Sequence, residues 1–377
     1  MTKKLMISAG EASGELYGAL LSREVKKLWA ETEIFGIGGA RMENEGVSLI
    51  APVSHVVGIV EAVTHLKEIK NTLKKATDAL TGKRPDVLVL IDYPDFNIAL
   101  AERARAAGIP ILYYVSPQVW AWRGGRVKKI ASLVNRMAVL FPFEADYYKD
   151  TGLPCEFVGH PIVETINIQS SKRELKKTLG LDPDKGVITL LPGSRPGEIK
   201  RHQAIIKDVA EKIHHEFPEM QTVVPLTAES PLPEGLPDHV KVVRSRTAEA
   251  VACSEASAVA SGTATLEATL LYTPMVVFYK VSFLTYHIVK LMARVKFISL
   301  VNILSGKEVV KELLQKEADP DRIFTELKKI LTDASYRDAM ISELKNIGKI
   351  MQGKKPSARV ACIVGEMAGW SGANAPV

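Results

Sequence analysis

The sequence predicts an α/β protein built from two doubly wound, Rossmann-like domains. With 377 residues, the chain is longer than the size at which a single hydrophobic core stops growing. Short apolar runs alternate with segments of helical periodicity, which is typical of parallel strands that helices cover on both faces. The runs fall into two sets along the chain, and two sets indicate two sheets.

The predicted strands define the domain limits. The first set covers residues 5–9, 87–92, 111–116 and 137–141, and the second covers 187–193, 222–226, 240–243, 258–261 and 275–279. Helical segments such as 19–31 and 202–217 lie between them. The polar stretch NIQSSKRELKK follows the first set. We therefore expect a first domain at 1–168, a second at 169–351, and a C-terminal helix and tail at 352–377. The first domain is a candidate surface on which that helix packs.

Composition and charge exclude several classes of protein. The cysteines Cys155, Cys253 and Cys362 lie at unrelated spacings, so we expect no disulfide framework, no zinc site and a reducing compartment. A net charge of +6 is compatible with anionic substrates or an anionic membrane surface and too small to indicate nucleic acid. No secretory signal is expected, and basic residues interrupt the most apolar stretch, 278–301, so no membrane-spanning helix is expected either.

The loop after the first predicted strand, GEASGELYGA, combines glycines with carboxylates. Gly10, and the glycines four and eight residues later, allow the backbone to approach a ligand closely. Their spacing differs from the dinucleotide fingerprint, so NAD is not expected. Glu11 follows the strand directly, where a carboxylate can accept hydrogen bonds from sugar hydroxyls. The alternative is that Ser13 and Glu15 only cap the next helix.

Two further loops of the first domain carry polar or aromatic residues. Asp92 and Asp95 bracket a proline after the second predicted strand; either can act as a general base, or the segment is an ordinary turn. A metal site would need more oxygen ligands and is not expected. After the third strand, Trp120 and Trp122 can face a sugar or lipid chain or belong to the core, and nearby basic residues can meet phosphate or only solvent: Arg123, Arg126, Lys128 and Lys129.

The second domain contains two loops suited to phosphate. In LLPGSRPGEIKRH, backbone N–H groups of Gly193 and Ser194, the Arg195 guanidinium and the following helix can together hold a diphosphate. The segment lacks the Walker A pattern. In ASGTATLEA, a strand leads into Ser261, Gly262 and Thr263 and then a helix, on which Glu267 can accept bonds from ribose hydroxyls. The two loops indicate a bound nucleoside diphosphate.

The motifs GEASGE, DYPDFN, VSPQVWAWR, FPFE, VGHP, LPGSR, ASGTATLE and LVNILSGKEVVKELLQ, in this order, resemble the lipid-A-disaccharide synthase family of GT-B-type glycosyltransferases from Gram-negative bacteria. The resemblance spans nearly the whole chain, and VSPQVWAWR is its most specific element. It implies an interdomain cleft and the inverting transfer of a sugar from UDP-2,3-diacylglucosamine to 2,3-diacylglucosamine 1-phosphate, which forms a β-1,6-linked disaccharide phosphate and UDP. It also implies a cytoplasmic enzyme, peripheral to the inner face of the membrane, without metal or other cofactor.

The resemblance assigns roles on the acceptor side. It makes Asp95 the expected base, with Glu11 and Asp92 as alternatives. His160 is a candidate for the acceptor phosphate and equally for a structural histidine. The other expected acceptor or acyl contacts are Gly10, Ser13, Trp120, Trp122 and Arg123.

On the donor side, the resemblance implies that Ser194 and Arg195 stabilise the diphosphate and that Glu267 binds the ribose. Further expected UDP contacts are Gly193, Ser261, Gly262, Thr263, Asn302, Glu312 and Gln315, with Glu308 an additional candidate. Without the resemblance, residues 302–315 look like an exposed amphipathic helix. Glu15 stands where the family usually has Asp, so a direct substrate role for this position is in question.

A basic apolar stripe predicts contact with lipid. Val56, Ile59, Val60, Val63, Leu66, Ile69 and Leu73 recur at helical spacing, beside Lys67, Lys70, Lys74 and Lys75. Such a helix can lie on anionic lipid or can pack on a domain core, and the acylated substrates favour lipid. The stretch 278–301 is the second candidate. The expected partners are thus the two lipid substrates and the membrane surface, without nucleic acid, and a homodimer is left open.

Two other functions are compatible with the same pattern. One is another UDP-sugar enzyme, such as a 2-epimerase or a transferase with a non-acylated acceptor. The other is a nucleotide-sugar binder without catalytic activity, which would tolerate the loss of Asp95. The VSPQVWAWR motif and the apolar stripes favour the acylated substrates.

Overall fold

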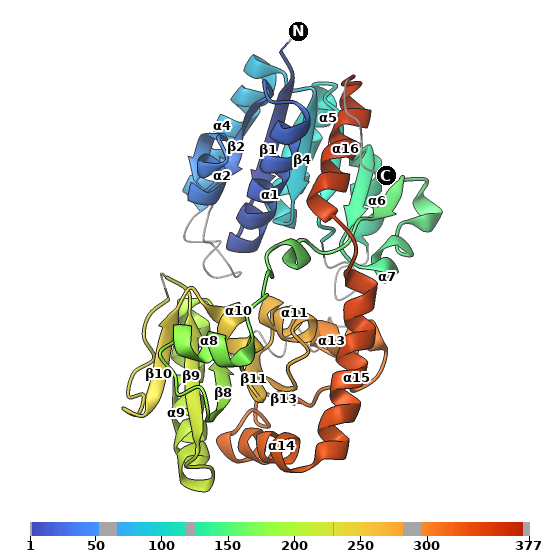
Figure 1. Cartoon of the computed structure of the whole chain (residues 1–377). Helices are drawn as coiled ribbons and strands as arrows, with labels where there is room; N and C mark the ends of the chain where they lie inside the picture. Colours follow the sequence, from blue (N-terminus) through green and yellow to red (C-terminus); the bar gives the residue numbers. More distant parts are fainter. Residues whose placement is uncertain (1, 53–65, 118–124, 229, 282–295, 372–377) are drawn as a thin grey trace. The chain divides into compact units, whose positions relative to one another are not determined.

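The chain divides into two compact units (Figure 1). The computed structural model describes residues 2–52, 66–117, 125–228, 230–281 and 296–371. Unit 1 comprises Met1–Pro161 and Lys354–Val377, and unit 2 comprises Ile162–Gly353. Both are α/β, as the sequence predicts. The last helix of the chain is assigned to unit 1.

Unit 1 contains a parallel sheet in the order β3-β2-β1-β4-β5-β6-β7. Its strands are β1 (Lys4–Ala9), β2 (Glu33–Gly38), β3 (Ser48–Pro52), β4 (Val87–Ile91), β5 (Ile111–Tyr114), β6 (Arg136–Val139) and β7 (Cys155–Phe157). The sequence pattern predicts four of them. The additional strands β2, β3 and β7 contain glycines or a proline or are very short, so their apolar signal is weak. Gly36 in β2 is required because a side chain there would collide with the Ile7 carbonyl.

Helices cover both faces of this sheet. They are α1 (Ala12–Leu28), α2 (Ala40–Asn44), α4 (Leu66–Lys83), α5 (Pro94–Ala106), α6 (Arg126–Leu133), α7 (Pro142–Ala145) and α16 (Pro356–Ala368), with short 3-10 turns at Lys149–Thr151 and Pro161–Glu164. Leu80 of α4, Leu100 of α5 and Ile130 of α6 pack in one core cluster with Leu88 and Leu90 of β4. Helix α16 packs beside α1.

Charged and aromatic contacts fix α16 to unit 1. The Arg359 guanidinium donates to both carboxylate oxygens of Glu156, at 2.6 and 2.9 Å, and to Glu366 at 2.8 Å. Arg136 bridges the same two carboxylates at 3.0 and 2.5 Å. Trp370, just after α16, meets the Trp29 ring edge to face, with 5.1 Å between ring centroids. The helix is therefore an integral part of unit 1.

Unit 2 repeats the same strand order with six parallel strands, β10-β9-β8-β11-β12-β13. They are β8 (Gly186–Leu191), β9 (Met220–Leu226), β10 (Val240–Arg244), β11 (Ala256–Ala260), β12 (Met275–Tyr279) and β13 (Glu312–Leu314). The helices are α8 (Lys172–Thr178), α9 (Pro196–Glu216), α10 (Thr247–Ala252), α11 (Thr263–Leu270), α13 (Leu300–Ser305), α14 (Pro320–Thr332) and α15 (Ala334–Met351).

The structure contradicts one alternative that the sequence leaves open for unit 2. Residues 302–315 do not form an exposed amphipathic helix, because α13 ends at Gly306 in the left-handed region (φ 69°) and the chain then enters β13. Asn302 is fully buried, as is Val310 between the two elements. The apolar residues that suggested a helix face belong to the core of the unit.

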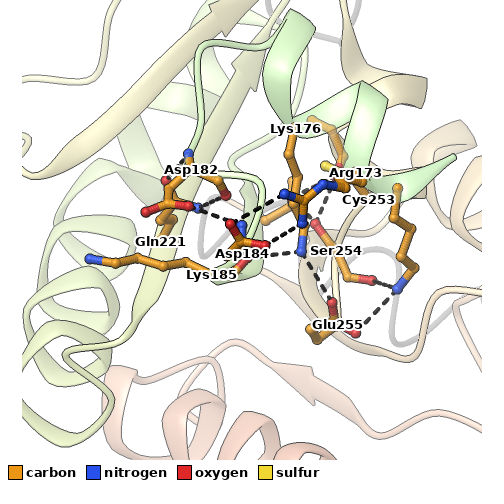
Figure 2. A network of polar contacts seen from close by, with 12 residues as sticks. Arg173, Lys176, Asp182, Asp184, Lys185, Gln221, Cys253, Ser254 and Glu255 are labelled. Carbon is orange, nitrogen blue, oxygen red and sulfur yellow. Dashed lines mark hydrogen bonds and ion pairs between the residues drawn. The ribbon is translucent and has the colours of Figure 1, made fainter. Parts of the chain in front are cut away.

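A network of polar contacts in unit 2 joins α8 to the segments that precede two strands (Figure 2). Lys176, which is buried, donates to the Lys185 carbonyl at 2.8 Å, and Lys172 reaches the Ser254 carbonyl at 2.9 Å and the Glu255 carboxylate at 3.1 Å. These residues precede β8 and β11, so they lie at the amino ends of the strands. Ligands of open α/β sheets bind at the carboxyl ends. The network therefore anchors α8 and is not a candidate site.

Replacing Gly365 by Ala is expected to destabilise unit 1 by about 1–3 kcal/mol, because the added methyl group would collide with the buried Trp29 ring. Gly82 of α4 is the matched control, since a methyl group there meets nothing within 4 Å. Gly82→Ala should be neutral or stabilise by up to about 1 kcal/mol. All four tryptophans fall within unit 1, so urea denaturation followed by tryptophan fluorescence reports on this unit. Equal effects of the two substitutions would contradict the packing described for α16.

Candidate functional site

The candidate site loops follow the strands at which each sheet reverses its order. In unit 1 the reversal lies between β1 and β4, and in unit 2 between β8 and β11. Crevices for ligands form at such switch points, beyond the carboxyl ends of the strands. The sequence motifs GEASGE and DYPDFN follow β1 and β4, and LPGSR and ASGTATLE surround the ends of β8 and β11. Within each unit, the two predicted loops are therefore neighbours.

The turn after β4 is tight and packs on the loop after β1. Asp92 and Tyr93 both adopt left-handed backbone conformations, with φ of 49° and 47°, which is uncommon for residues other than glycine. Gly10 is buried directly against Tyr93, and a side chain at position 10 would collide with the tyrosine. Gly10 is therefore required for the contact between the two loops.

The buried side chain of Asn97 links this turn to β1 by hydrogen bonds. Asn97 on α5 accepts a hydrogen bond from the Ser8 hydroxyl at 2.7 Å, and its amide nitrogen donates to the Asp92 carbonyl at 2.7 Å. The Tyr113 hydroxyl donates to the same carbonyl at 2.9 Å. Asn97 was not among the predicted site residues. Its signal in the sequence is an amide on an otherwise apolar helix face.

Asp95 lies in the first turn of α5 with 74% of its side chain exposed, and it forms an ion pair with Arg126 at the start of α6. Glu11 is the N-cap residue of α1 and is half-buried. A second ion pair, Lys129 to Glu102 at 2.8 Å, also joins α6 to α5. The exposed Asp95 carboxylate is thus held by its neighbour and accessible to a ligand.

Glu15 makes a contact that neither interpretation of this residue, capping of α1 or direct binding of substrate, predicts. Its carboxylate accepts a hydrogen bond from the Arg41 N–H at 2.8 Å, in the first turn of α2. It therefore caps α2. Helix α1 begins at Glu11 without a side-chain hydrogen bond at its N-cap, and Glu15 contributes an acidic residue to its first turn. Ser13 is half-buried in the first turn of α1.

His160 has the surroundings of a structural histidine. It is 4% exposed, its ring lies 5.5 Å from Phe141 and 5.7 Å from Tyr17, and its Nε2 is 3.4 Å from the Tyr17 hydroxyl. Burial lowers its pKa to about 3. A neutral imidazole lacks the charge that would attract a phosphate, so this observation favours the structural alternative.

Several predicted contacts lie outside the described residues. These are Val56, Ile59, Val60 and Val63 of the apolar stripe, most of the stretch 278–301, and Trp120, Trp122 and Arg123. The rest of the stripe begins α4, where Leu66 is exposed while Ile69 and Leu73 pack on the core of unit 1. The four neighbouring lysines are exposed. Among the helices that the structure describes, none has the length and hydropathy needed to span a membrane.

In unit 2, the loop after β8 is organised around Glu198. The Ser194 and Arg195 N–H groups donate to its carboxylate at 3.2 and 3.3 Å. The Ser194 N–H is therefore engaged within the protein, contrary to the expectation that it is free for a diphosphate. Gly193 has a φ of 109°, which favours glycine. The Arg195 side chain is 48% exposed and lies 3.4 Å from Glu198.

The loop after β11 leaves its polar groups more open. Gly262 and Thr263 are exposed and Ser261 is half-buried, ahead of α11. On this helix, burial raises the pKa of Glu267 to about 7. Within the described part of the chain, the Glu267 carboxylate has no hydrogen-bond or ion-pair partner. It is therefore suited to accept hydrogen bonds from ligand hydroxyls, as the sequence predicts.

Two of the predicted nucleotide contacts have side chains that the protein itself engages. The Asn302 amide is saturated: its nitrogen donates to the Val310 carbonyl and to Glu312, both at 2.8 Å, and its oxygen accepts from the Val309 and Val310 N–H groups. Glu312 also accepts from the Ser299 hydroxyl at 2.7 Å. Asn302 and Glu312 thus hold α13 against β13, and their side chains have little capacity left for a nucleotide.

The other two candidates from residues 302–315 are Glu308, which precedes β13, and Gln315, which follows it. The Gln315 amide pairs with the backbone of Val281, donating at 3.3 Å and accepting at 3.2 Å. Glu308 is exposed beside Lys311. Where the structure describes the side chains, no three of the types His, Cys, Asp and Glu are grouped to hold a metal ion.

Comparison with known proteins agrees with the sequence motifs. The family model described as lipid-A-disaccharide synthetase matches residues 5–362. A lipid-A-disaccharide synthase of Geobacter sulfurreducens is 42% identical over 374 residues, which is 97% of each chain. One from Myxococcus xanthus is 40% identical over 90% of this chain and 91% of its own.

Solved structures share the fold at low identity. A UDP complex of MnaA from S. aureus has a TM-score of 0.68 at 12% identity, covering 98% of this chain and 97% of its own. A UDP-GlcNAc 2-epimerase from Neisseria meningitidis, bound to UDP-GlcNAc, has a TM-score of 0.65 at 12% identity, covering 96% and 99%. The spinosyn rhamnosyltransferase SpnG, complexed with thymidine diphosphate, has a TM-score of 0.65 at 13% identity, covering 96% and 100%.

Glu267→Gln is expected to stabilise unit 2 at alkaline pH. The folded state raises the pKa of Glu267 from 4.5 to about 7. Between pH 4.5 and 7 the Glu267 carboxyl is ionised in the unfolded chain but still protonated in the folded protein. The wild type therefore loses stability as pH rises through this range, and the Gln variant, whose amide does not titrate, does not. Hydrogen exchange of β8 and β11, compared between variant and wild type near pH 5 and near pH 8, should show the larger gain at the higher pH.

The control for this measurement is Glu249→Gln on α10, a carboxylate that pairs with Arg246 at 3.2 Å. For Glu249→Gln, the protection of β8 and β11 from hydrogen exchange, relative to the wild type, should not increase between pH 5 and pH 8. An equal gain for both variants, or none for Glu267→Gln, would contradict the unpartnered, largely buried state of Glu267.

Proposed function

Because the chain belongs to the lipid-A-disaccharide synthetase family, we propose that it transfers 2,3-diacylglucosamine from UDP to the 6-hydroxyl of 2,3-diacylglucosamine 1-phosphate, in the biosynthesis of lipid A. The anomeric carbon forms a bond to the acceptor oxygen and loses its bond to the diphosphate, with inversion. The hydroxyl proton passes to a protein base, and UDP leaves. The observation that carries the proposal is the pairing of family motifs with the switch-point loops of both sheets.

Unit 2 supplies the groups suited to the nucleotide. Glu267, unpartnered within the described chain, would accept bonds from the ribose hydroxyls. The half-exposed Arg195 guanidinium would meet the diphosphate and stabilise the charge that develops on it as the sugar leaves. UDP-bound and TDP-bound proteins among the structural neighbours support nucleotide binding by this fold.

Unit 1 supplies the carboxylates suited to the acceptor. Asp95 is the base of choice because it is exposed and lies at the carboxyl end of the sheet, where Arg126 orients it. A base must come within hydrogen-bond reach of the hydroxyl that it deprotonates, and exposure permits this. Glu11 and Asp92 remain the alternative bases.

The membrane surface is the proposed location, since both substrates carry acyl chains. The exposed Leu66 and the lysines at 67, 70, 74 and 75 give the start of α4 an apolar and basic surface. Such surfaces bind anionic lipid through buried apolar area and electrostatic attraction.

Asp95→Asn is expected to lower kcat by roughly 10²–10⁴-fold, because it removes the base and keeps the shape of the side chain. The measurement is UDP release from UDP-2,3-diacylglucosamine in detergent micelles with EDTA, with and without the acceptor. Glu102→Gln is the matched control, since Glu102 forms the other ion pair between α5 and α6. It should keep full activity.

The other outcomes of this assay are informative. Activity that persists in Asp95→Asn but falls in Glu11→Gln or Asp92→Asn would move the base to that residue. UDP release that does not need the acceptor, or none from the wild type, would contradict the proposed transfer and favour other UDP-sugar chemistry.

The double variant Lys70→Glu/Lys74→Glu is expected to weaken binding to vesicles containing anionic lipid by roughly tenfold or more, at about 1 kcal/mol per lysine. Lys345→Glu/Lys349→Glu on α15 is the control, since it makes the same charge change at the same helical spacing on exposed residues. Vesicle flotation compares the two. Equal losses would show that only net charge matters and would contradict a binding surface on α4.

A further inference from the structure

We propose that Glu198 is a positioning residue that shapes the diphosphate-binding loop of unit 2, and that Tyr279 and His202 hold the flanks of that loop. The inference rests on the proposed function, in which this loop and Arg195 receive the diphosphate of the nucleotide sugar. Neither Glu198 nor its two partners was a predicted site residue.

Both carboxylate oxygens of Glu198 are occupied by donors from the loop and from β12. One oxygen accepts from the Ser194 and Arg195 N–H groups, at 3.2 and 3.3 Å. The other accepts from the Tyr279 hydroxyl at 3.0 Å and lies 3.4 Å from the Arg195 guanidinium. Glu198 is only 7% exposed and lies in the first turn of α9, where the helix dipole favours a negative charge.

These contacts decide which groups can face a ligand. The Ser194 N–H group, which the sequence assigns to the diphosphate, points toward Glu198. The adjoining Arg195 N–H group does the same. Contacts within the protein therefore support the shape of the loop. The Arg195 guanidinium makes the longest of the four contacts and is half-exposed, so it is accessible to a diphosphate while the shorter bonds hold the loop.

Gly193 makes room for the carboxylate. A Cβ atom at this position would lie 2.6 Å from a Glu198 oxygen and 2.8 Å from the Glu198 Cβ. The glycine thus serves the contact between loop and carboxylate in addition to its positive φ. This gives Gly193 a structural reason for its place in the motif beside its predicted role as a backbone donor.

His202, one turn further along α9, ties the ends of two strands. Its Nδ1 lies 2.7 Å from the Pro192 carbonyl, and the Lys280 N–H lies 3.1 Å from its Nε2. Because a backbone N–H donates to Nε2, the proton is on Nδ1 and the ring is neutral; burial lowers the pKa of His202 in the same sense. Pro192 follows β8 and Lys280 follows β12, which flank β11 in the sheet. Glu198 and His202 therefore fix the framework on both sides of the loop that precedes Glu267.

The test compares UDP affinity, by titration calorimetry, in the wild type and three variants. Glu198→Ala should weaken UDP binding by about tenfold or more, because the Ser194 and Arg195 N–H groups lose their acceptor and the loop changes shape. Glu198→Gln keeps a neutral acceptor and should lose less, and Tyr279→Phe removes one contact and should also lose less. In steady-state assays, the KM for the UDP-sugar should rise while the KM for the acceptor stays unchanged.

Glu174→Ala is the matched control. Glu174 occupies the same third helical position in α8 and accepts from the Ser171 N–H at 2.8 Å, as Glu198 does in α9. Its loss should reduce stability like that of any helix cap and leave UDP affinity within about twofold. A role of Glu198 in stability alone would lower the active fraction and leave both KM values unchanged.

Each remaining outcome is decisive. UDP affinity in Glu198→Ala equal to that of the wild type would overturn the positioning role, and tighter binding would show that the carboxylate competes with the diphosphate. If Glu198→Ala does not fold, unchanged affinity in both Glu198→Gln and Tyr279→Phe would overturn the role. A folded wild type that does not bind UDP would instead contradict the proposed function, and the positioning role with it.

Discussion

Parallel strands direct their carboxyl ends to one edge of a sheet, and the candidate site of this protein depends on that constraint. In each unit the order reverses next to the first strand, so two loops leave the same edge in opposite directions. The chain places glycines, carboxylates and an arginine in these four loops. The polar network before β8 and β11 lies at the other edge, and its bonds serve only to hold α8. Position along the strands thus separates residues that can meet a ligand from residues that stabilise the fold.

Most of the sheet architecture could be predicted from the sequence, because parallel strands buried on both faces form continuous apolar runs. The strands β2, β3, β7 and β13 escaped prediction for physical reasons. Gly36 in β2 weakens the strand signal yet is needed for the approach of the Ile7 carbonyl, and β7 and β13 have three residues each. Likewise, residues 302–315 have helical spacing in the sequence, but Gly306 ends α13 and the chain continues into β13.

The motifs fall on the loops at the switch points of both sheets, but residue identity alone does not reveal which side chains the fold already engages. Only the resemblance makes Asn302 and Glu312 candidate nucleotide contacts, and the fold engages the side chains of both. Glu15 reaches a second helix through a distant contact that spacing does not predict. By contrast, Glu267 has no partner in the part of the chain that the structure describes, and burial raises its pKa. The resemblance supplied the roles, and the hydrogen bonds decide which residues can fill them.

The two units share a local solution for the loop between strand and helix. Phe141-Pro142-Phe143-Glu144 in unit 1 repeats the arrangement of Arg195-Pro196-Gly197-Glu198 in unit 2. Glu144 is buried and accepts from the Leu140 and Phe141 N–H groups, both at 3.0 Å. In each case the proline starts the helix and the glutamate two residues later satisfies the N–H groups that precede it. A buried carboxylate near a phosphate-type loop is therefore compatible with a role in shaping the loop.

The assignment of α16 to unit 1 has a consequence for biosynthesis. Unit 2 is continuous in the chain, whereas unit 1 is interrupted by it. On the ribosome, the helix that carries Arg359 and its contacts to Glu156 emerges only after all of unit 2 has been made. Domains usually fold as units during synthesis, in order from the N-terminus. Here unit 2 can complete its core first, while residues 1–161 of unit 1 have been translated but still lack the helix that completes their unit.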